Sequence, residues 1–238
     1  MTEPASVVVV GDTMLDREVD GDVRRLSPDA PVPVVDEQTV RSRPGGAGLA
    51  ALLAAGRGRR VTLITALAGD AAGGELRAAL LAAGIEIVDL RLGGATPEKI
   101  RLRTGSRVLL RLDRGGAAGR VGPARATARA AIEWAGAVLV ADYGRGVAGD
   151  AALREMLAAR ATRTPLVWDP HPRGPEPVAG ATVVTPNADE AAHFAGSSGP
   201  QRADHAARHG ALLAWRWSVP HVCVTCGARG AVLVDAAG

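Results

Sequence analysis

Acidic and amide side chains recur in this sequence directly after short apolar runs. Asp12 and Asp16 follow the run at residues 6–10. Four more such residues follow later runs: Asp142, Asp169, Asn187 and Glu190. Carboxylate and amide oxygens accept hydrogen bonds from hydroxyls and, through Mg²⁺, contact phosphate oxygens. Asp and Asn more commonly serve as N-caps or turn residues. If the apolar runs are neighbouring strands, these residues predict one site for hydroxyls and phosphates.

Two glycine-rich stretches are further candidates for ligand binding. Gly45 and Gly46 precede an Ala/Leu-rich segment, so a turn that tolerates only residues without Cβ leads into a helix N-terminus. The first helical turn offers unsatisfied N–H donors to a ligand. Near the end of the sequence, Thr225, Gly227 and Gly230 form a loop whose backbone a flat or anionic ligand can approach. Hairpins and ordinary loops use the same glycines.

Alternating strand and helix patterns predict the elements that position these residues. Strands are expected at residues 6–10, 61–66, 85–90, 137–141, 165–168, 182–185, 221–225 and 231–234. Helices are expected at residues 47–55, 71–83, 123–134, 150–159, 188–195 and 203–215. Strands separated by helices imply right-handed crossovers and a mostly parallel sheet. Ligands of such sheets bind beyond the carboxyl ends of the strands, where the polar residues fall.

Two segments interrupt this alternation. Residues 14–38 contain short, proline-broken β-type pieces, which suit an edge or a small separate sheet. Residues 97–113 alternate apolar and charged side chains around Thr104-Gly105-Ser106, as in a hairpin with one solvated face. We expect the two segments to pair in a small second sheet, so that residues 1–238 form one α/β domain with a β appendage.

Composition excludes several classes of protein. With 47% hydrophobic and 22% charged residues, the chain of 238 residues is globular. The 28 basic residues are interspersed with 25 acidic ones without a basic block, so no nucleic-acid partner is expected. Neither a signal peptide nor an apolar run of membrane-spanning length is visible, which predicts a cytoplasmic protein without membrane contact.

Three other chemical motifs lack a feature that their chemistry requires. Cys223 and Cys226 lie in a β-branched run where a redox C-x-x-C motif needs a helix. His205 and His209 lack the glutamate of a zincin helix, and the first strand lacks the G-x-G-x-x-G turn of a dinucleotide oxidoreductase.

Several stretches together resemble a known family. They are residues 8–16, 25–34, 43–46, 110–113, 141–146, 168–170, 185–190 and 224–227. In these stretches the sequence resembles the ribokinase-like (phosphofructokinase B) sugar kinases. More narrowly, it is similar to the bacterial heptose 7-phosphate kinases, which form the kinase half of a bifunctional heptose kinase/adenylyltransferase. The run Ser-Pro-Asp-Ala-Pro-Val-Pro-Val at residues 27–34 is the most specific match.

The resemblance implies a three-layer α/β sandwich with a small β-sheet lid, and a kinase that uses ATP and Mg²⁺. It implies phosphoryl transfer to the anomeric hydroxyl of D-glycero-D-manno-heptose 7-phosphate, which gives the 1,7-bisphosphate. The lid segments, at about 14–38 and 97–113, would also form a homodimer contact. The implied sugar-phosphate site is Asp16, Gly45, Gly46, Asp142, and Lys99 with Arg101 or Arg103. The implied nucleotide site is Asp169, Thr225, Gly227 and Gly230, with Asn187 and Glu190 organising Mg²⁺ and the phosphates.

Three departures from the family pattern qualify the resemblance. The Gly-Ala-Gly-Asp motif with the family's catalytic base is absent up to Gly238, so no base is assigned and we expect it beyond that residue. Leu49 replaces the usual asparagine of the glycine signature, which affects sugar identity. His171 replaces a lysine, and the lost positive charge weakens transition-state stabilisation unless an arginine such as Arg173 substitutes for it. Alternatives are therefore an inactive or truncated binding relative and a kinase for another sugar.

Overall fold

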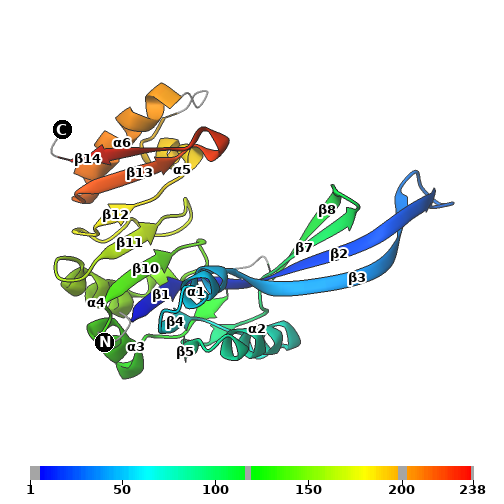
Figure 1. The fold of residues 1–238 in the computed structure, drawn as a ribbon, viewed down its shortest axis with the longest axis horizontal. Coiled ribbons are helices and arrows are strands. Elements are labelled where there is room, and N and C mark those ends of the chain that lie inside the picture. The colour runs from blue at the N-terminus through cyan, green and yellow to red at the C-terminus, as the bar shows by residue number, and fades with distance from the viewer. Residues whose placement is uncertain (1–5, 116–118, 198–202, 237–238) are drawn as a thin grey trace.

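The body of the protein is an open eight-stranded sheet (Figure 1) in a computed structural model that describes residues 6–115, 119–197 and 203–236. The strands lie in the order β14-β13-β12-β11-β10-β1-β4-β5. Their bounds are β1 Val7–Gly11, β4 Val61–Thr65, β5 Glu86–Asp89, β10 Ala137–Ala141, β11 Leu166–Asp169, β12 Val183–Val184, β13 His221–Thr225 and β14 Ala231–Asp235. All pairs are parallel except β13 with β14. The expectation of a mostly parallel sheet is confirmed.

Strand β1 lies inside the sheet because its sequence is apolar on both sides. Residues 8–10 are all valines with at most 2% of their surface exposed. A strand buried on both faces fits the interior of a parallel sheet. β1 pairs with β4 on one side and with β10 on the other. The register sets Gly11 beside Ala141 and Ala141 beside Asp169, so three carboxyl ends lie next to one another.

Helices cover both faces and complete three layers. Their bounds are α1 Ala47–Ala55, α2 Ala71–Ala82, α3 Ala126–Glu133, α4 Ala151–Ala161, α5 Ala188–Phe194 and α6 Ala203–Trp217. Helices α3, α4, α5 and α6 pack on one face around the buried Trp168, and α1 and α2 pack on the other. Helices α2 and α4 begin at the N-caps Asp70 and Asp150, whose carboxylates accept the N–H of Gly73 and Leu153.

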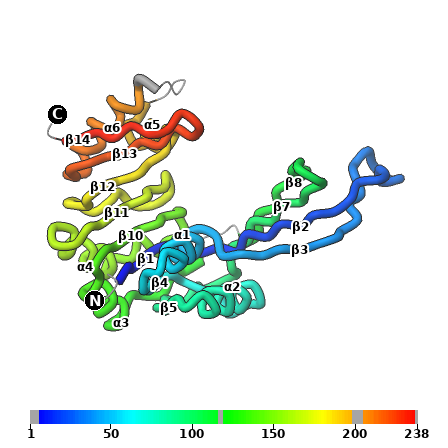
Figure 2. Tube along the Cα trace, viewed as in Figure 1, coloured from blue at the N-terminus to red at the C-terminus, as the bar shows by residue number. Residues whose placement is uncertain are grey.

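A four-stranded sheet projects from the body as an arm, visible in Figure 1 and along the chain trace of Figure 2. Its order is β3-β2-β7-β8. The bounds are β2 Thr13–Leu26, β3 Pro33–Gly46, β7 Glu98–Thr104 and β8 Arg107–Arg114. The two irregular segments do pair in one sheet, but β2 and β3 are long continuous strands instead of short pieces. Gly45 and Gly46 therefore end a strand, and α1 begins directly after them.

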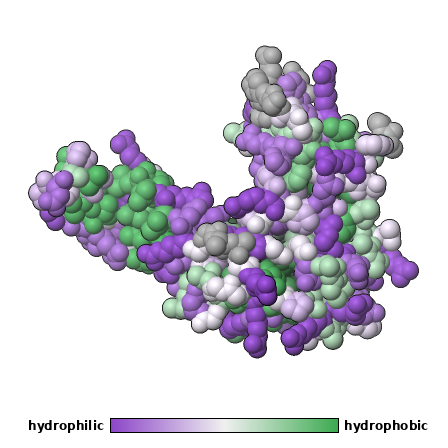
Figure 3. All heavy atoms as spheres, turned by 180° about the vertical axis from the view of Figure 1, so that it is seen from behind, coloured by the Kyte–Doolittle hydropathy of each residue, from purple (hydrophilic) through white to green (hydrophobic). Residues whose placement is uncertain are grey.

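The two faces of the arm differ in character. Cross-strand register sets Asp16, Lys99 and Arg101 on one face, because Asp16 pairs with Lys99 and Glu18 with Arg101. The opposite face carries the apolar side chains Val19, Val40, Ile100, Leu102, Leu110 and Leu112. We call this set the apolar arm face. Three of its members are among the exposed large hydrophobic residues, with Val40 at 44%, Leu110 at 55% and Leu112 at 41%. Figure 3 shows apolar surface on the arm.

Smaller differences from the sequence expectations occur at element ends. Helix α6 extends two residues further, to Trp217. A short antiparallel pair, β6 (Leu92–Gly93) with β9 (Arg120–Val121), was not anticipated. Single-turn 3₁₀ helices occur at Val147–Gly149 and Gly227–Arg229.

Over the described part of the chain, no helix combines the length and apolarity needed to cross a bilayer.

Candidate active site

Polar residues form a row along the carboxyl edge of the sheet. In strand order from β13 to β1 they are Thr225, Asn187, Asp169, Asp142 and Asp12. Backbone contacts join neighbours in the row. Asn187 and Thr225 form a parallel bridge, and the N–H of Asp142 donates to the carbonyl of Asp169 at 3.0 Å. The residues singled out after separate apolar runs are therefore brought to one edge.

Asp12 does not offer its carboxylate to a ligand, contrary to the sequence expectation. Its Oδ2 accepts the backbone N–H groups of Tyr143 and Arg145, each at 3.0 Å, and its Oδ1 accepts that of Val147 at 3.1 Å. The residue is 3% exposed. Asp12 is thus an internal acceptor for the loop after β10, a role that the sequence pattern does not distinguish from ligand binding.

Asp16 lies on β2 at the base of the arm instead of in a loop. Its Oδ1 is buried and accepts no hydrogen bond from any residue that the structure describes. The nearest cation is Arg101, with Nη1 3.6 Å from that oxygen. Gly45 lies against the same carboxylate, because a Cβ there would approach Oδ2 to 2.7 Å. A buried carboxylate oxygen without a donor is unusual in a folded protein and is satisfied when a ligand hydroxyl donates to it.

Lys99 joins the arm to the body. Its ammonium lies 5.4 Å from the centre of the Tyr143 ring, a cation–π contact. Burial lowers the pKa of Lys99, and the nearby Asp16 opposes that shift. Arg103, the alternative partner proposed for a phosphate, is paired with Glu18 at 3.3 Å.

Two residues of the loop after β10 were not assigned a role from the sequence. Tyr143 lies under Lys99, and Nη1 of Arg145 donates to the carbonyl of Gly115 at 2.9 Å. No carboxylate among the described residues forms an ion pair with Arg145. The signal that could have identified them is the run Asp-Tyr-Gly-Arg-Gly directly after a buried strand.

Asp142 is enclosed behind the loop that follows β11. Its Oδ1 accepts the N–H of Gly144 at 2.7 Å, and its Oδ2 is buried without a partner among the described residues. A Cβ on Gly174 would overlap that oxygen at 1.7 Å. Burial raises the pKa of Asp142 to about 7, and the nearby carboxylates of Asp12 and Asp169 add to the effect, while the Gly144 N–H opposes it.

This pKa predicts how stability depends on pH. Between about pH 4 and about pH 7 the folded state keeps a proton on Asp142 that the unfolded chain has released, so the free energy of unfolding falls as pH rises. Urea unfolding at about pH 5 and about pH 8 should show this decrease, and Asp142→Asn should reduce it. Equal pH dependence in the wild type and the variant would contradict the assignment.

Asp169 and Glu190 form no ion pair with any cation among the residues that the structure describes. Burial raises the pKa of Asp169 to about 6; the hydroxyl of Thr185, which donates to its Oδ1 at 3.1 Å, opposes this, and Glu190 adds to it. Burial also raises the pKa of Glu190, against the hydrogen bonds from Asn187. A cation would favour both charged forms.

Asn187 and Glu190 form the N-terminal capping box of α5. Asn187 Oδ1 accepts the N–H of Asp189 at 2.9 Å and that of Glu190 at 3.0 Å, and Glu190 Oε2 accepts the N–H of Asn187 at 2.8 Å. The described residues contain no group of three acidic, His or Cys side chains that could enclose a metal. Mg²⁺ is commonly held by one or two carboxylates together with substrate phosphates, so Glu190 and Asp169 fit such an ion.

The β13–β14 loop exposes backbone beside Asn187. Gly227 and Gly230 have φ angles of 61° and 88°, and no atom lies within 4 Å of the positions their Cβ atoms would take. Both glycines are needed for the hairpin conformation, and the N–H of Cys226 donates to the carbonyl of Gly230 at 2.8 Å. The open space next to Thr225 leaves room for a flat ligand at this end of the row.

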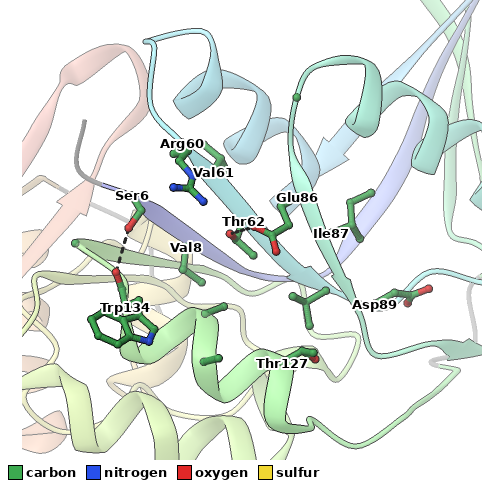
Figure 4. A pocket seen from close by; sticks show the side chains of 15 residues that line it. Ser6, Val8, Arg60, Val61, Thr62, Glu86, Ile87, Asp89, Thr127 and Trp134 are labelled. Carbon is green, nitrogen blue, oxygen red and sulfur yellow. Dashed lines mark hydrogen bonds between the residues drawn. The ribbon is translucent and has the colours of Figure 1, made fainter. Parts of the chain in front are cut away.

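One cavity lies away from the row of polar residues. It has a volume of about 980 Å³ and lies at the opposite edge, beside the amino ends of β1 and β4 (Figure 4). Two hydrogen bonds join residues of its lining: Ser6 donates to the carbonyl of Trp134 at 3.1 Å, and Thr62 donates to Glu86 at 3.2 Å. None of the candidate residues named from the sequence lines it.

Solved structures define the class of this fold. The Arabidopsis thaliana ribokinase complexed with ribose and ATP superposes with a TM-score of 0.69 at 16% identity, covering 99% of this chain and 76% of the other. The microbiome-derived acarbose kinase Mak1 gives a TM-score of 0.71 at 23% identity, with coverages of 99% and 74%. The parallel sheet, its polar carboxyl edge and the projecting β arm are thus the ribokinase-like fold.

Sequence comparison identifies the family within this class. The model for pfkB family carbohydrate kinases matches residues 4–238. The "Bifunctional protein HldE" of Streptomyces coelicolor is 52% identical over 98% of this chain and 49% of its own length. That of Azorhizobium caulinodans is 36% identical over 98% of this chain and 50% of its own. The chain belongs to the pfkB carbohydrate kinase family, and it spans about half the length of these curated relatives.

Proposed function

We propose that this chain is the kinase part of a heptose 7-phosphate kinase, which transfers the γ-phosphoryl group of ATP to the anomeric hydroxyl of D-glycero-D-manno-heptose 7-phosphate. The product is the 1,7-bisphosphate. The observation that carries the proposal is the buried Oδ1 of Asp16, an acceptor to which no described residue donates, beside Lys99 on the same face of the arm. The first group suits a sugar hydroxyl, and the second suits the phosphate that the substrate already carries. The similarity to HldE proteins supports the heptose assignment.

The sugar phosphate is proposed to bind at the base of the arm. Asp16 accepts sugar hydroxyls, and the bare backbone at Gly45 and Gly46 lets the ring approach. Lys99 contacts the existing phosphate, and Arg145, which forms no ion pair with a carboxylate that the structure describes, lies in the loop after β10. Arg101 is paired with Asp16 at 3.6 Å, so its contribution is to hold that carboxylate. Asp142 is enclosed, so we propose that it acts on the sugar only through the loop it supports.

The nucleotide is proposed to bind at the other end of the row. Thr225, Gly227 and Gly230 border the adenine nucleotide, whose phosphates extend towards Asp169 and Glu190. Mg²⁺ bound with the nucleotide would neutralise phosphate charge during transfer. Glu190 and Asp169 would hold it, and Asn187 would orient Glu190 through the capping box. We assign no catalytic base. Because ATP and phosphorylated sugars are cytoplasmic metabolites, we place the protein in the cytoplasm.

The proposed role of Glu190 in binding Mg²⁺ can be separated from its role in capping α5. A capping box accepts Gln as well as Glu at this position, so Glu190→Gln preserves the cap and removes the charge. We expect the affinity for MgATP to fall about tenfold, which corresponds to about 1.4 kcal/mol, with little change in thermal stability. Asp189→Asn removes an equal charge one residue earlier and should leave MgATP affinity within about twofold. Equal effects of the two variants would refute a specific role for Glu190.

Substrate identity is tested by turnover of the full-length gene product. An ADP-release assay with ATP and Mg²⁺ should show the highest kcat/KM with heptose 7-phosphate, and lower values with fructose 6-phosphate and ribose. Fastest turnover of ribose would indicate a kinase for another sugar. Binding of heptose 7-phosphate without ADP release would favour an inactive relative that retains the site.

We also propose a homodimer through the apolar arm face. An uncovered sheet face with several exposed aliphatic side chains indicates a protein contact surface. A second copy presents the same face, and two such faces are self-complementary about a two-fold axis.

A single substitution tests this contact. Leu110→Asp introduces a charge into the apolar arm face and should convert the dimer to a monomer in light-scattering measurements at micromolar concentration. Leu233, which is 67% exposed on the edge strand β14, provides the control, because Leu233→Asp should leave the dimer intact. A wild-type monomer would show that the arm does not self-associate.

A further inference from the structure

Asp12 joins two parts of the candidate site that are distant in sequence. Its carboxylate accepts three backbone N–H groups from Tyr143, Arg145 and Val147, at 3.0 to 3.1 Å. Its backbone carbonyl accepts the N–H of Ala47, the first residue of α1, at 3.0 Å. The same residue therefore contacts the loop after β10 and the start of the helix that follows the glycine pair.

Asp12 is tightly packed against its neighbours. A Cβ on Gly46 would approach the Asp12 carbonyl oxygen to 2.4 Å and the Tyr143 ring to 3.4 Å. The Asp12 residue itself is 3% exposed, so water cannot readily replace its hydrogen bonds. Hydrogen bonds from N–H groups to a buried carboxylate are stronger than those to a neutral acceptor. The loop and the glycine pair are held in one relative position by this contact.

The loop held by Asp12 carries the groups that face the arm. Tyr143 supplies the ring under Lys99, and Arg145 reaches the carbonyl of Gly115 directly after β8. Moving the backbone of Tyr143 would shift the support of the lysine that we place on the substrate phosphate. This shift would affect the sugar-phosphate end of the row and not the nucleotide end, because Asn187 and Glu190 are held by their own capping box.

We propose that Asp12 is a positioning residue for the sugar-phosphate site: its carboxylate fixes the Tyr143–Val147 loop against Gly46, so that Tyr143 holds Lys99 at the substrate phosphate. The second half of this proposal rests on the proposed function. The first half, that Asp12 holds the loop, does not. Asparagine at this position has the same shape but carries no charge, and its amide NH₂ would face backbone N–H donors.

Amide hydrogen exchange tests the loop contact without any substrate. In the wild type, the amides of Tyr143, Arg145 and Val147 should be protected. In Asp12→Asn their exchange should increase at least about tenfold, while amides of β13 and α6 stay within about twofold. Asp16 lies close by but accepts none of these N–H groups, so Asp16→Asn should leave their exchange unchanged. Unprotected amides in the wild type, or a uniform increase over the whole chain in the variant, would overturn the proposal.

Ligand binding tests the consequence for the site. In Asp12→Asn, the Kd for heptose 7-phosphate should rise at least about fivefold, and the Kd for a non-hydrolysable ATP analogue should stay within about twofold. If Asp12→Asn does not fold, Asp12→Ser, which leaves room for a water molecule, takes its place. Equal weakening of both ligands would overturn the specific link to the sugar-phosphate end. If the exchange result holds but the wild type binds no heptose 7-phosphate, the proposed function fails and the loop contact stands.

Discussion

Replacing Asp16 by asparagine is expected to weaken binding of heptose 7-phosphate about 10- to 100-fold. A hydrogen bond to a charged acceptor contributes about 1.5–3 kcal/mol, and asparagine removes the charge while keeping the shape. The substitution also removes the partner of Arg101, which lies 3.6 Å away. Isothermal titration of residues 1–238 with the sugar phosphate measures the change, and a nucleotide titration of the same sample should show an unaltered affinity.

A matched variant lies on the same strand. Asp20 is four residues along β2 on the same face, where it pairs with Arg41 at 2.6 Å. Asp20→Asn removes an identical charge further out on the arm and should leave sugar binding within about twofold, because exposed ion pairs contribute little. If both variants weaken binding equally, the effect is a general one of charge on the arm, and Asp16 has no direct contact with the sugar.

Replacing Gly46 by alanine is expected to destabilise the protein by about 2–3 kcal/mol and to abolish detectable sugar binding. Gly46 has φ 60° and ψ −134°, a conformation that residues with a Cβ strongly disfavour. The added Cβ would also lie 2.4 Å from the carbonyl oxygen of Asp12, a backbone atom that cannot move without shifting β1. Urea unfolding measures the loss of stability, and calorimetric titration measures binding.

Substitutions at two other glycines distinguish backbone strain from steric clash as causes of the expected effect of Gly46→Ala. Gly58 has φ 72° but no atom within 4 Å of its Cβ position, so Gly58→Ala carries the backbone strain alone and should cost about 1 kcal/mol. At Gly45 the Cβ would meet the end of the Asp16 side chain, so Gly45→Ala should weaken sugar binding more than it affects stability. An effect of Gly46→Ala no larger than that of Gly58→Ala would show that the clash is absent.

The order of elements could be predicted from the sequence because apolar runs and helical patterns alternate regularly. β1, α1, β10 and β13 begin and end within a residue or two of their expected bounds. The row of candidate residues followed from one rule, that polar residues after parallel strands meet at the carboxyl edge. The apolar arm face was not predicted, since its members lie on four different strands and share a face only through the cross-strand register.

Individual side-chain roles were less predictable. Asp12 and Asp16 are both acidic and four residues apart, yet Asp12 accepts three backbone N–H groups and Oδ1 of Asp16 accepts none from the described residues. The difference depends on a loop more than 130 residues away in sequence. Asn187 shows the reverse case, because N-capping is the commoner role of asparagine in such a loop and Asn187 does cap α5. The run Asp-Tyr-Gly-Arg-Gly marks Tyr143 and Arg145 as candidates, but their roles depend on contacts with Lys99 and Gly115, which are distant in sequence.

The most direct test of the proposed substrate is a comparison of three ligands on the wild-type chain. Titration of residues 1–238 with heptose 7-phosphate, unphosphorylated heptose and inorganic phosphate, each with Mg²⁺ and a non-hydrolysable ATP analogue, measures the contribution of each part of the substrate. We expect heptose 7-phosphate to bind at least about tenfold more tightly than either of the others, because Asp16 and Lys99 act on one molecule. Equal affinity for the sugar with and without its phosphate would contradict the account.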